Sequence, residues 1–154
     1  MQARMRHPAV LIPEAMQALL VLSKVARTQG LPQTTVELVQ LRVSQINHSS
    51  VCVDGTARSA AVAGATEEQR AAVAGWRAST CFTDAERAAL ALAEAVTRLA
   101  DRTGPVPAEV REEAARHFTE QELAALLLAI GVANTFNRIN VTTRRIAGAP
   151  HWDA

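Results

Sequence analysis

Apolar residues recur at three- and four-residue steps along most of the chain, which is the spacing of amphipathic helices. This pattern predicts helices over residues 9–27 and 34–46, and a third helix that begins after Ser49 or Ser50. Later helices are expected to begin at Thr66, Thr83, Pro107 and Thr119. No segment alternates apolar and polar residues as a half-buried strand does. We therefore expect an all-α fold, a bundle of about seven helices that forms a single domain over residues 1–154.

Several helix starts carry the pattern of a capping box, in which a Thr is followed three residues later by Glu or Gln. The four examples are Thr34–Glu37, Thr66–Gln69, Thr83–Glu86 and Thr119–Glu122. The first of them gives Glu37 a purely structural explanation, and the sequence leaves this open beside a functional one. Asn47 is expected to end its helix, and Ser49 or Ser50 is a suitable cap for the next. Cys52 then falls in the first turn of that helix.

The last long helix carries the longest apolar stretch of the chain, Leu123–Ala133. Because it is apolar on more than one side, we expect it at the centre of the bundle or at a subunit interface. The stretch is shorter than the ~20 residues that a membrane-spanning helix needs. Near the N-terminus, Pro13 and Glu14 interrupt the apolar run that a signal sequence would require. The sequence therefore predicts a soluble, cytoplasmic protein without a membrane partner.

The charged residues are mixed in sign, and the formal net charge is +1 at pH 7. No basic block stands out, so nucleic acid is not an expected partner. Two cysteines, Cys52 and Cys81, are too few for a disulfide framework. No His and Cys residues have the spacing of zinc ligands, and we expect neither a metal nor a cofactor.

Cys52 is the first candidate for a functional residue. At the start of a helix it lies at the positive end of the helix dipole, which favours the thiolate, and the thiolate is the nucleophilic form. The alternative is that Cys52 is a buried cysteine that packs as a small apolar residue. Later in the chain, Asn134, Asn137 and Asn140 interrupt an apolar helix at three-residue steps. We interpret these asparagines as hydrogen-bonding across a helix or subunit contact rather than as catalytic residues.

The segment ELVQLRVSQIN, followed by SSVCVD, resembles the core of the carboxymuconolactone decarboxylase superfamily, specifically its alkylhydroperoxidase D-like members. The turn at 64–68, the helix start at 82–87 and the asparagine-containing segment 134–140 are similar to that family as well. The resemblance covers roughly positions 10 to 145. It implies an all-helical fold and a homo-oligomer, commonly a trimer or hexamer.

In alkylhydroperoxidase D-like proteins a Glu, a Cys-x-x-Cys pair and a His carry out thiol peroxidase chemistry. The resemblance places the Glu at Glu37, and the cysteine that attacks peroxide at Cys52. The resolving cysteine falls on Ser49 and the His on Thr56, so two of the four positions have departed. A serine cannot condense with a sulfenic acid to form a disulfide, and a threonine hydroxyl is no base near neutral pH.

Two residues are candidates to compensate for these departures. His48 lies next to the helix break, and an imidazole there could serve as a general base near neutral pH, although it could equally point to solvent. Cys81 is a conceivable distant resolving thiol, but nothing in the sequence places it near Cys52. The candidate catalytic residues are therefore Cys52, Glu37 and His48.

Three functions follow from these residues and the resemblance. The first is a one-cysteine thiol peroxidase, in which Glu37 acts as acid and base, Cys52 attacks a small-molecule hydroperoxide, and an external thiol reduces the sulfenate. The second is a redox-inactive oligomeric protein that binds a small molecule in the same pocket. The third is a decarboxylase or lyase like the namesake of the family, for which no convincing set of residues surrounds Glu37.

Overall fold

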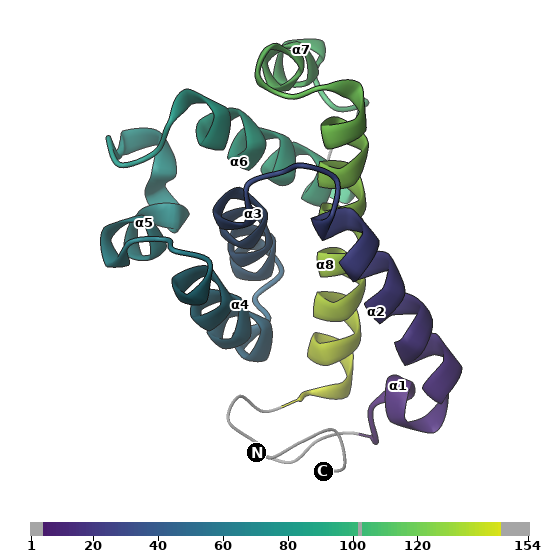
Figure 1. The fold of residues 1–154 in the computed structure, drawn as a ribbon. Helices are drawn as coiled ribbons and strands as arrows, with labels where there is room; N and C mark the ends of the chain where they lie inside the picture. The colour runs from purple at the N-terminus through teal and green to yellow at the C-terminus, as the bar shows by residue number, and fades with distance from the viewer. Residues whose placement is uncertain (1–4, 102, 146–154) are drawn as a thin grey trace.

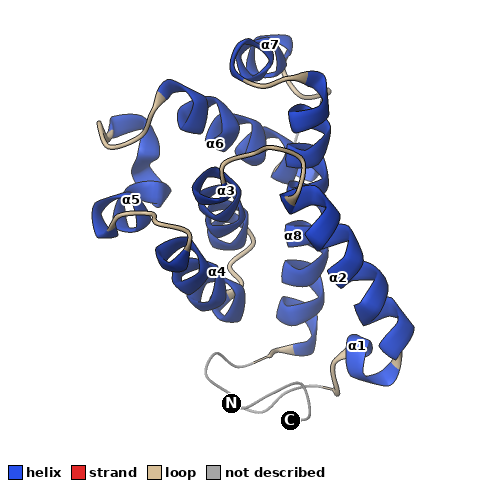
Figure 2. Cartoon of the chain, viewed as in Figure 1, coloured by secondary structure: helices blue, strands red, loops and turns tan. Residues whose placement is uncertain are grey.

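The computed structural model describes residues 5–101 and 103–145, and within these residues it contains α-helices and short 3-10 helices but no strand (Figure 2). The α-helices are α1 (Pro8–Leu11), α2 (Pro13–Arg27), α3 (Gln33–Ile46), α4 (Ser50–Val62), α5 (Glu67–Ala72), α6 (Asp84–Thr97), α7 (Ala108–His117) and α8 (Glu120–Thr143). The 3-10 helices are η1 (Val73–Ala78) and η2 (Leu99–Asp101). The expected all-α fold is confirmed.

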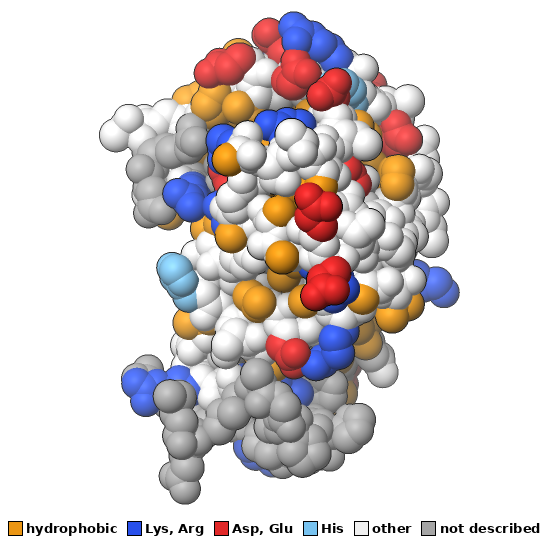
Figure 3. All heavy atoms as spheres, turned by 90° about the vertical axis from the view of Figure 1, so that its left-hand side faces the viewer, with side chains coloured by type: hydrophobic (Ala, Val, Ile, Leu, Met, Phe, Trp, Pro, Cys, Tyr) orange, Lys and Arg blue, Asp and Glu red, His pale blue; other side chains and the backbone are white. Residues whose placement is uncertain are grey.

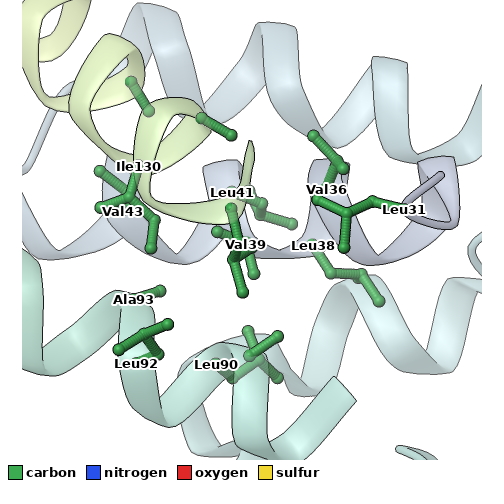
Figure 4. Packing of buried hydrophobic residues seen from close by; sticks show 14 of the residues in the cluster. Leu31, Val36, Leu38, Val39, Leu41, Val43, Leu90, Leu92, Ala93 and Ile130 are labelled. Atoms are coloured by element: carbon green, nitrogen blue, oxygen red, sulfur yellow. The ribbon is translucent and has the colours of Figure 1, made fainter. Parts of the chain in front are cut away.

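Helix α3 lies at the centre of the bundle, with α4, α6 and α8 packed around it (Figure 1). Its side chains are buried on nearly every side, including those of Val39 and Leu41. Figure 4 shows Leu90 of α6 and Ile130 of α8 approaching these α3 residues from two directions. Burying a side chain of this size contributes about 1.5–3 kcal/mol relative to leaving it exposed.

The N-terminal helix is divided, whereas the sequence predicted one helix over residues 9–27. α1 ends at Leu11, and α2 begins at Pro13, which occupies the first position of the new helix. Proline removes a backbone donor and is tolerated at a helix start but not in its interior. The error was to place Pro13 inside the first turn of a longer helix.

Three of the four predicted capping boxes are confirmed, at the starts of α5, α6 and α8. The fourth, Thr34–Glu37, is wrong. Pro32 is the N-cap residue of α3, and the Thr34 hydroxyl donates at 2.8 Å to the carbonyl oxygen of Ala63 at the end of α4. Ser49 is the N-cap residue of α4 as predicted, but its side chain makes no capping hydrogen bond.

Helix α8 runs through the bundle against α2, α3 and α6, which confirms its expected central place. By length and composition it could also cross a membrane, but half of its most apolar stretch is buried inside the protein. The core helix of a soluble protein meets the same criterion. Half of the large apolar side chains that remain exposed belong to α1, α2 and the residue between them: Leu11, Ile12, Leu20, Val21, Leu22 and Val25.

The face formed by α4, α5 and η1 carries acidic and basic side chains interspersed with apolar ones (Figure 3). No broad patch of one sign is visible on this face. The picture agrees with the mixed charge along the sequence.

Candidate functional site

Cys52 lies in the first turn of α4, as predicted, and is half-buried. It lines a cavity of about 250 Å³ between α2, α3, α4 and α8. Val132, Ala133 and Phe136 of α8 form the apolar wall of this cavity, which we call the Cys52 cavity. Its polar wall includes Arg27 of α2. The structure thus gives the thiol a place beside a small, mainly apolar cavity with a charged group on its wall.

Asn140 connects α8 directly to the candidate nucleophile, because its Nδ2 donates to Cys52 Sγ at 3.1 Å. An N–H donor stabilises a thiolate more than a thiol, since hydrogen bonds to a charged group are the stronger ones. Asn134 accepts at 2.9 Å from Asn47, and Asn137 donates at 3.2 Å to Ser44 Oγ. The interpretation that the asparagines bond across helix contacts is confirmed, and one of them reaches the site.

The two positions that depart from the alkylhydroperoxidase D-like pattern do not supply the missing chemistry. The Thr56 hydroxyl donates at 2.7 Å to the carbonyl oxygen of Cys52, one turn earlier in α4. Ser49 is buried, and its Oγ has no hydrogen-bond partner among the described residues. Thr56 therefore completes a backbone contact, and the Ser49 hydroxyl remains unsatisfied beside the start of α4.

Glu37 is buried, and its Oε1 forms an ion pair with Nη1 of Arg27. The second guanidinium nitrogen, Nη2, donates to Gln40 Oε1 at 2.9 Å. The carboxylate is thus bound neither to its own first turn nor directly to Cys52. Arg27, which pairs with Glu37, also lines the cavity that Cys52 lines.

Glu37 itself lines a second cavity of about 530 Å³, which we call the α3–α4 groove. Its walls include Gln33 of α3 and, from α4, Ser59 and Val62. Gly55 lines both the groove and the Cys52 cavity. Glu37 is thus linked to the Cys52 cavity through Arg27, which pairs with its carboxylate and itself lines that cavity.

His48 and Cys81 are not among the residues that line the Cys52 cavity. His48 follows α3 with a positive φ of 54° and has an exposed side chain. Cys81 lies in the loop before α6, with its sulfur 3.0 Å from Ser79 Oγ. The structure thus brings neither the candidate base nor the candidate second thiol into the cavity.

Sequence reasoning missed Arg27 and His7. No local sequence pattern predicts the place of Arg27 in the site, because its partners belong to another helix. His7 caps α1 through Nδ1, which accepts from the backbone N–H of Ala9 at 3.1 Å. Burial lowers the pKa of His7, nearby Arg145 lowers it further, and the side chain of Asn140 opposes both effects. The buried ring therefore lies beside the asparagine that contacts Cys52.

Within residues 5–101 and 103–145, no group of three or more His, Cys, Asp or Glu side chains is gathered as a metal site would require. The chemistry available at the described cavities therefore rests on a thiol, a carboxylate–guanidinium pair and amide groups. Such a set can stabilise a thiolate and bind a small polar molecule.

Residues 13–95 match the model of the carboxymuconolactone decarboxylase family. The chain belongs to this family. The uncharacterised protein YdfG of Bacillus subtilis is 30% identical over 129 residues, which cover 84% of this chain and 86% of that protein. The uncharacterised protein YnjA of Escherichia coli is 38% identical over 104 residues, or 67% of this chain and 55% of YnjA. The resemblance inferred from the motif is confirmed.

Solved structures of similar fold support the alkylhydroperoxidase D-like assignment. One of them is protein ATU0492 of Agrobacterium tumefaciens, which is of unknown function and is described as a putative antioxidant defence protein AhpD. It has a TM-score of 0.88 and is 32% identical to this chain, and the match covers 97% of this chain and 100% of ATU0492. The debrominase Bmp8 in complex with 2,3,4-tribromopyrrole has a TM-score of 0.79 and 21% identity over 90% of this chain and 73% of Bmp8. At that identity the second likeness shows the fold alone.

Proposed function

We propose that this member of the carboxymuconolactone decarboxylase family is a one-cysteine, thiol-dependent hydroperoxide reductase. The observation that carries the proposal is the Cys52 sulfur on the wall of a 250 Å³ cavity with the amide of Asn140 donating to it at 3.1 Å. The start of α4 and this donor both favour the thiolate.

The reaction proceeds in three balanced steps. The Cys52 thiolate attacks the terminal oxygen of a hydroperoxide, the O–O bond breaks, and the alkoxide leaves and takes up a proton to become an alcohol. An external thiol then attacks the resulting sulfenic acid, which releases water and leaves a mixed disulfide. A second external thiol restores Cys52 and departs as part of a small disulfide.

We propose a role for Glu37 that differs from the acid and base predicted from the sequence. Its carboxylate neutralises Arg27 and does not line the Cys52 cavity. We therefore assign Arg27 the contact with the polar end of the substrate, and Glu37 the role of positioning Arg27. His48 has no assigned role, because its side chain is exposed outside the cavity.

The experiment is hydroperoxide consumption with cumene hydroperoxide as oxidant and dithiothreitol as reductant. The native chain should consume peroxide faster than background, Cys52→Ser should return the rate to background, and Cys81→Ser should retain the native rate. Excess peroxide should convert Cys52 to the sulfinic acid, detected by mass spectrometry, because no second thiol lines the cavity to protect it. Equal consumption by the native chain and Cys52→Ser would refute the proposal.

The second candidate function is binding of a small molecule without redox turnover. It is favoured by Thr56, whose hydroxyl is committed to the backbone, and by the absence of His48 from the lining of the Cys52 cavity. The apolar wall suits a compact organic ligand, and 2,3,4-tribromopyrrole, which the similarly folded Bmp8 structure holds, is a reasonable probe. The decarboxylase alternative has less support, since Arg27 is already paired with Glu37.

We also propose that the chain assembles into a homo-oligomer through the exposed apolar side chains of α2. Val21 is 62% exposed and Leu20 is 54% exposed, and the same helix supplies Ser23 and Arg27 to the Cys52 cavity. Association through α2 would therefore take place beside the mouth of the cavity. Sedimentation of the native chain should give an oligomer, and Val21→Asp should dissociate it, whereas Val62→Asp on α4 should not.

A further inference from the structure

The side-chain amide of Asn140 has two ends, and the structure pairs one of them with the candidate nucleophile. Its Nδ2 donates to Cys52 Sγ at 3.1 Å. Its Oδ1 is buried and has no hydrogen-bond partner among the described residues. If the amide were turned over, its oxygen would face the sulfur and would disfavour a thiolate. The reactivity of Cys52 therefore depends on what holds the amide in this orientation.

The buried ring of His7 lies beside this amide. His7 comes directly before α1, and Figure 1 shows α1 at the end of the bundle where α8 finishes, close to Asn140 in the sequence. Burial and the charge of Arg145 lower the pKa of His7, whereas the side chain of Asn140 raises it. A protonated imidazole has only donors, so a neighbour that raises its pKa acts as an acceptor. In the Asn140 amide that acceptor is Oδ1.

The tautomer of His7 supplies a matching donor. Nδ1 accepts from the backbone N–H of Ala9 at 3.1 Å, so this nitrogen carries no proton. Because burial and Arg145 hold the pKa below its usual value of 6.5, the ring is neutral near neutral pH. The single ring proton is then on Nε2. A donor in the ring and an acceptor in the amide thus lie next to each other.

We infer that His7 is a positioning residue for Cys52. The His7 Nε2–H donates to Oδ1 of Asn140 and thereby directs Nδ2 of the same amide toward the Cys52 sulfur. His7 is not among the residues that line the Cys52 cavity, so it acts through Asn140 and not on a substrate. The inference rests on the proposed function, because it concerns the same thiol, but the reactivity of this thiol can be measured without peroxide.

The test measures the pKa of Cys52 from the pH dependence of its alkylation by iodoacetamide, in a chain that also carries Cys81→Ser. His7→Asn keeps an oxygen that can cap α1, because asparagine is a favoured N-cap residue, but it has no atom in the place of Nε2. The amide of Asn140 is then free to turn. The pKa of Cys52 should rise by about half a unit, and alkylation near neutral pH should slow by about threefold.

Two comparisons separate positioning from a general loss of structure. In a chain with Asn140→Leu, the further change His7→Asn should leave the alkylation rate nearly unchanged, because the amide through which His7 acts is gone. The matched variant His117→Asn, at the end of α7 where the ring contacts Glu113, should leave the pKa of Cys52 as it is in the native chain. Nitrogen NMR of the labelled full chain should also show His7 protonated on Nε2.

Three results would each overturn the inference. They are an unchanged pKa of Cys52 in His7→Asn, an equal slowing by His7→Asn with and without the Asn140 amide, and a His7 ring protonated on Nδ1. None of these measurements uses a hydroperoxide. A chain that passes all three tests and consumes no peroxide would keep the positioning role and lose the proposed reductase activity, whereas the opposite pair of results would keep only the activity.

Discussion

Two buried carboxylates, Glu94 and Glu37, are surrounded very differently. Glu94 of α6 receives Arg42 at 2.6 Å, the indole N–H of Trp76 at 3.1 Å and Arg77 at 2.5 Å. Both of its oxygens are thereby satisfied. Glu37 of α3 lines the α3–α4 groove and has one oxygen bound to Arg27, whereas the other has no partner among the described residues.

The difference separates a structural cluster from a candidate site. A completed network joins α3, η1 and α6 and leaves nothing for a ligand to bind. The incomplete network keeps an acceptor, an open wall at Gly55 and a thiol within one region of α3 and α4. Buried polar groups without partners are rare in native proteins and therefore indicate function more strongly than buried charge alone.

The largest expected effect is on stability, at Glu94. Glu94→Gln removes the charge that compensates Arg42, whose side chain is only 12% exposed, and should lower the free energy of unfolding by about 3 kcal/mol. Glu37→Gln should lower it by only about 1 kcal/mol, since the Arg27 side chain is 31% exposed and can turn toward water. Urea denaturation measures both. Equal losses would show that the two carboxylates are alike.

The second prediction concerns the reactivity of Cys52. Asn140→Leu removes the donor to the sulfur and should slow alkylation of Cys52 by iodoacetamide at neutral pH by about tenfold. Asn134→Leu, a matched change on the same face of α8, should lower stability through its lost bonds to Asn47 and Thr97 but leave the alkylation rate nearly unchanged. Both asparagine variants are made in a chain that also carries Cys81→Ser, so that Cys52 is the thiol that reacts. Similar rates in both asparagine variants would argue against a role for Asn140.

The third prediction is a pH dependence that originates at Glu94. Burial alone would raise the pKa of this carboxyl, but hydrogen bonds from Arg77, Arg42 and Trp76, with the charge of Arg42, hold it below the usual value of 4.5. Because the folded state binds the proton less tightly than the unfolded state, this contribution to stability is complete above pH 4.5 and is lost as the pH falls below it.

Unfolding free energies measured between pH 6 and pH 3 check this dependence. The native chain should lose stability more steeply below pH 4.5 than Glu94→Gln, which has no carboxyl to protonate at that position. Parallel curves for the two proteins would place the acid sensitivity elsewhere in the chain.

Local sequence patterns predicted the fold well, because the signals that set helix starts act over a few residues. The capping boxes at Thr66, Thr83 and Thr119 need only the residues that they contain, and all three formed. The same pattern failed at Thr34, where Pro32 begins the helix and a contact with the end of α4 takes the hydroxyl. A local rule fails where a tertiary partner competes for the same atom.

The candidate site was only partly predictable for the same reason. The position of Cys52 at the start of α4 followed from the break at Asn47. The partner of its sulfur, Asn140, lies 88 residues away, and no periodicity can pair the two. Arg27 pairs with Glu37 through a contact between α2 and α3, which the sequence does not encode locally. The family resemblance supplied the identities of the site positions but not this changed geometry.

The smallest expected effect is a gain in stability at Gly55. Gly55→Ala should raise the free energy of unfolding by about 0.5–1 kcal/mol, because alanine loses less backbone entropy in a helix and its methyl group enters open space. Gly131→Ala should give a similar gain, since its added Cβ also meets nothing within 4 Å. By contrast, Ala93 is fully buried in the core next to Glu94. Ala93→Val should therefore lower the free energy of unfolding by roughly 1–3 kcal/mol. Thermal and urea unfolding of the three variants would test whether the two glycine variants gain stability and the alanine variant loses it. A loss of stability in Gly55→Ala with a gain in Gly131→Ala would mean that the wall between the groove and the Cys52 cavity is already filled.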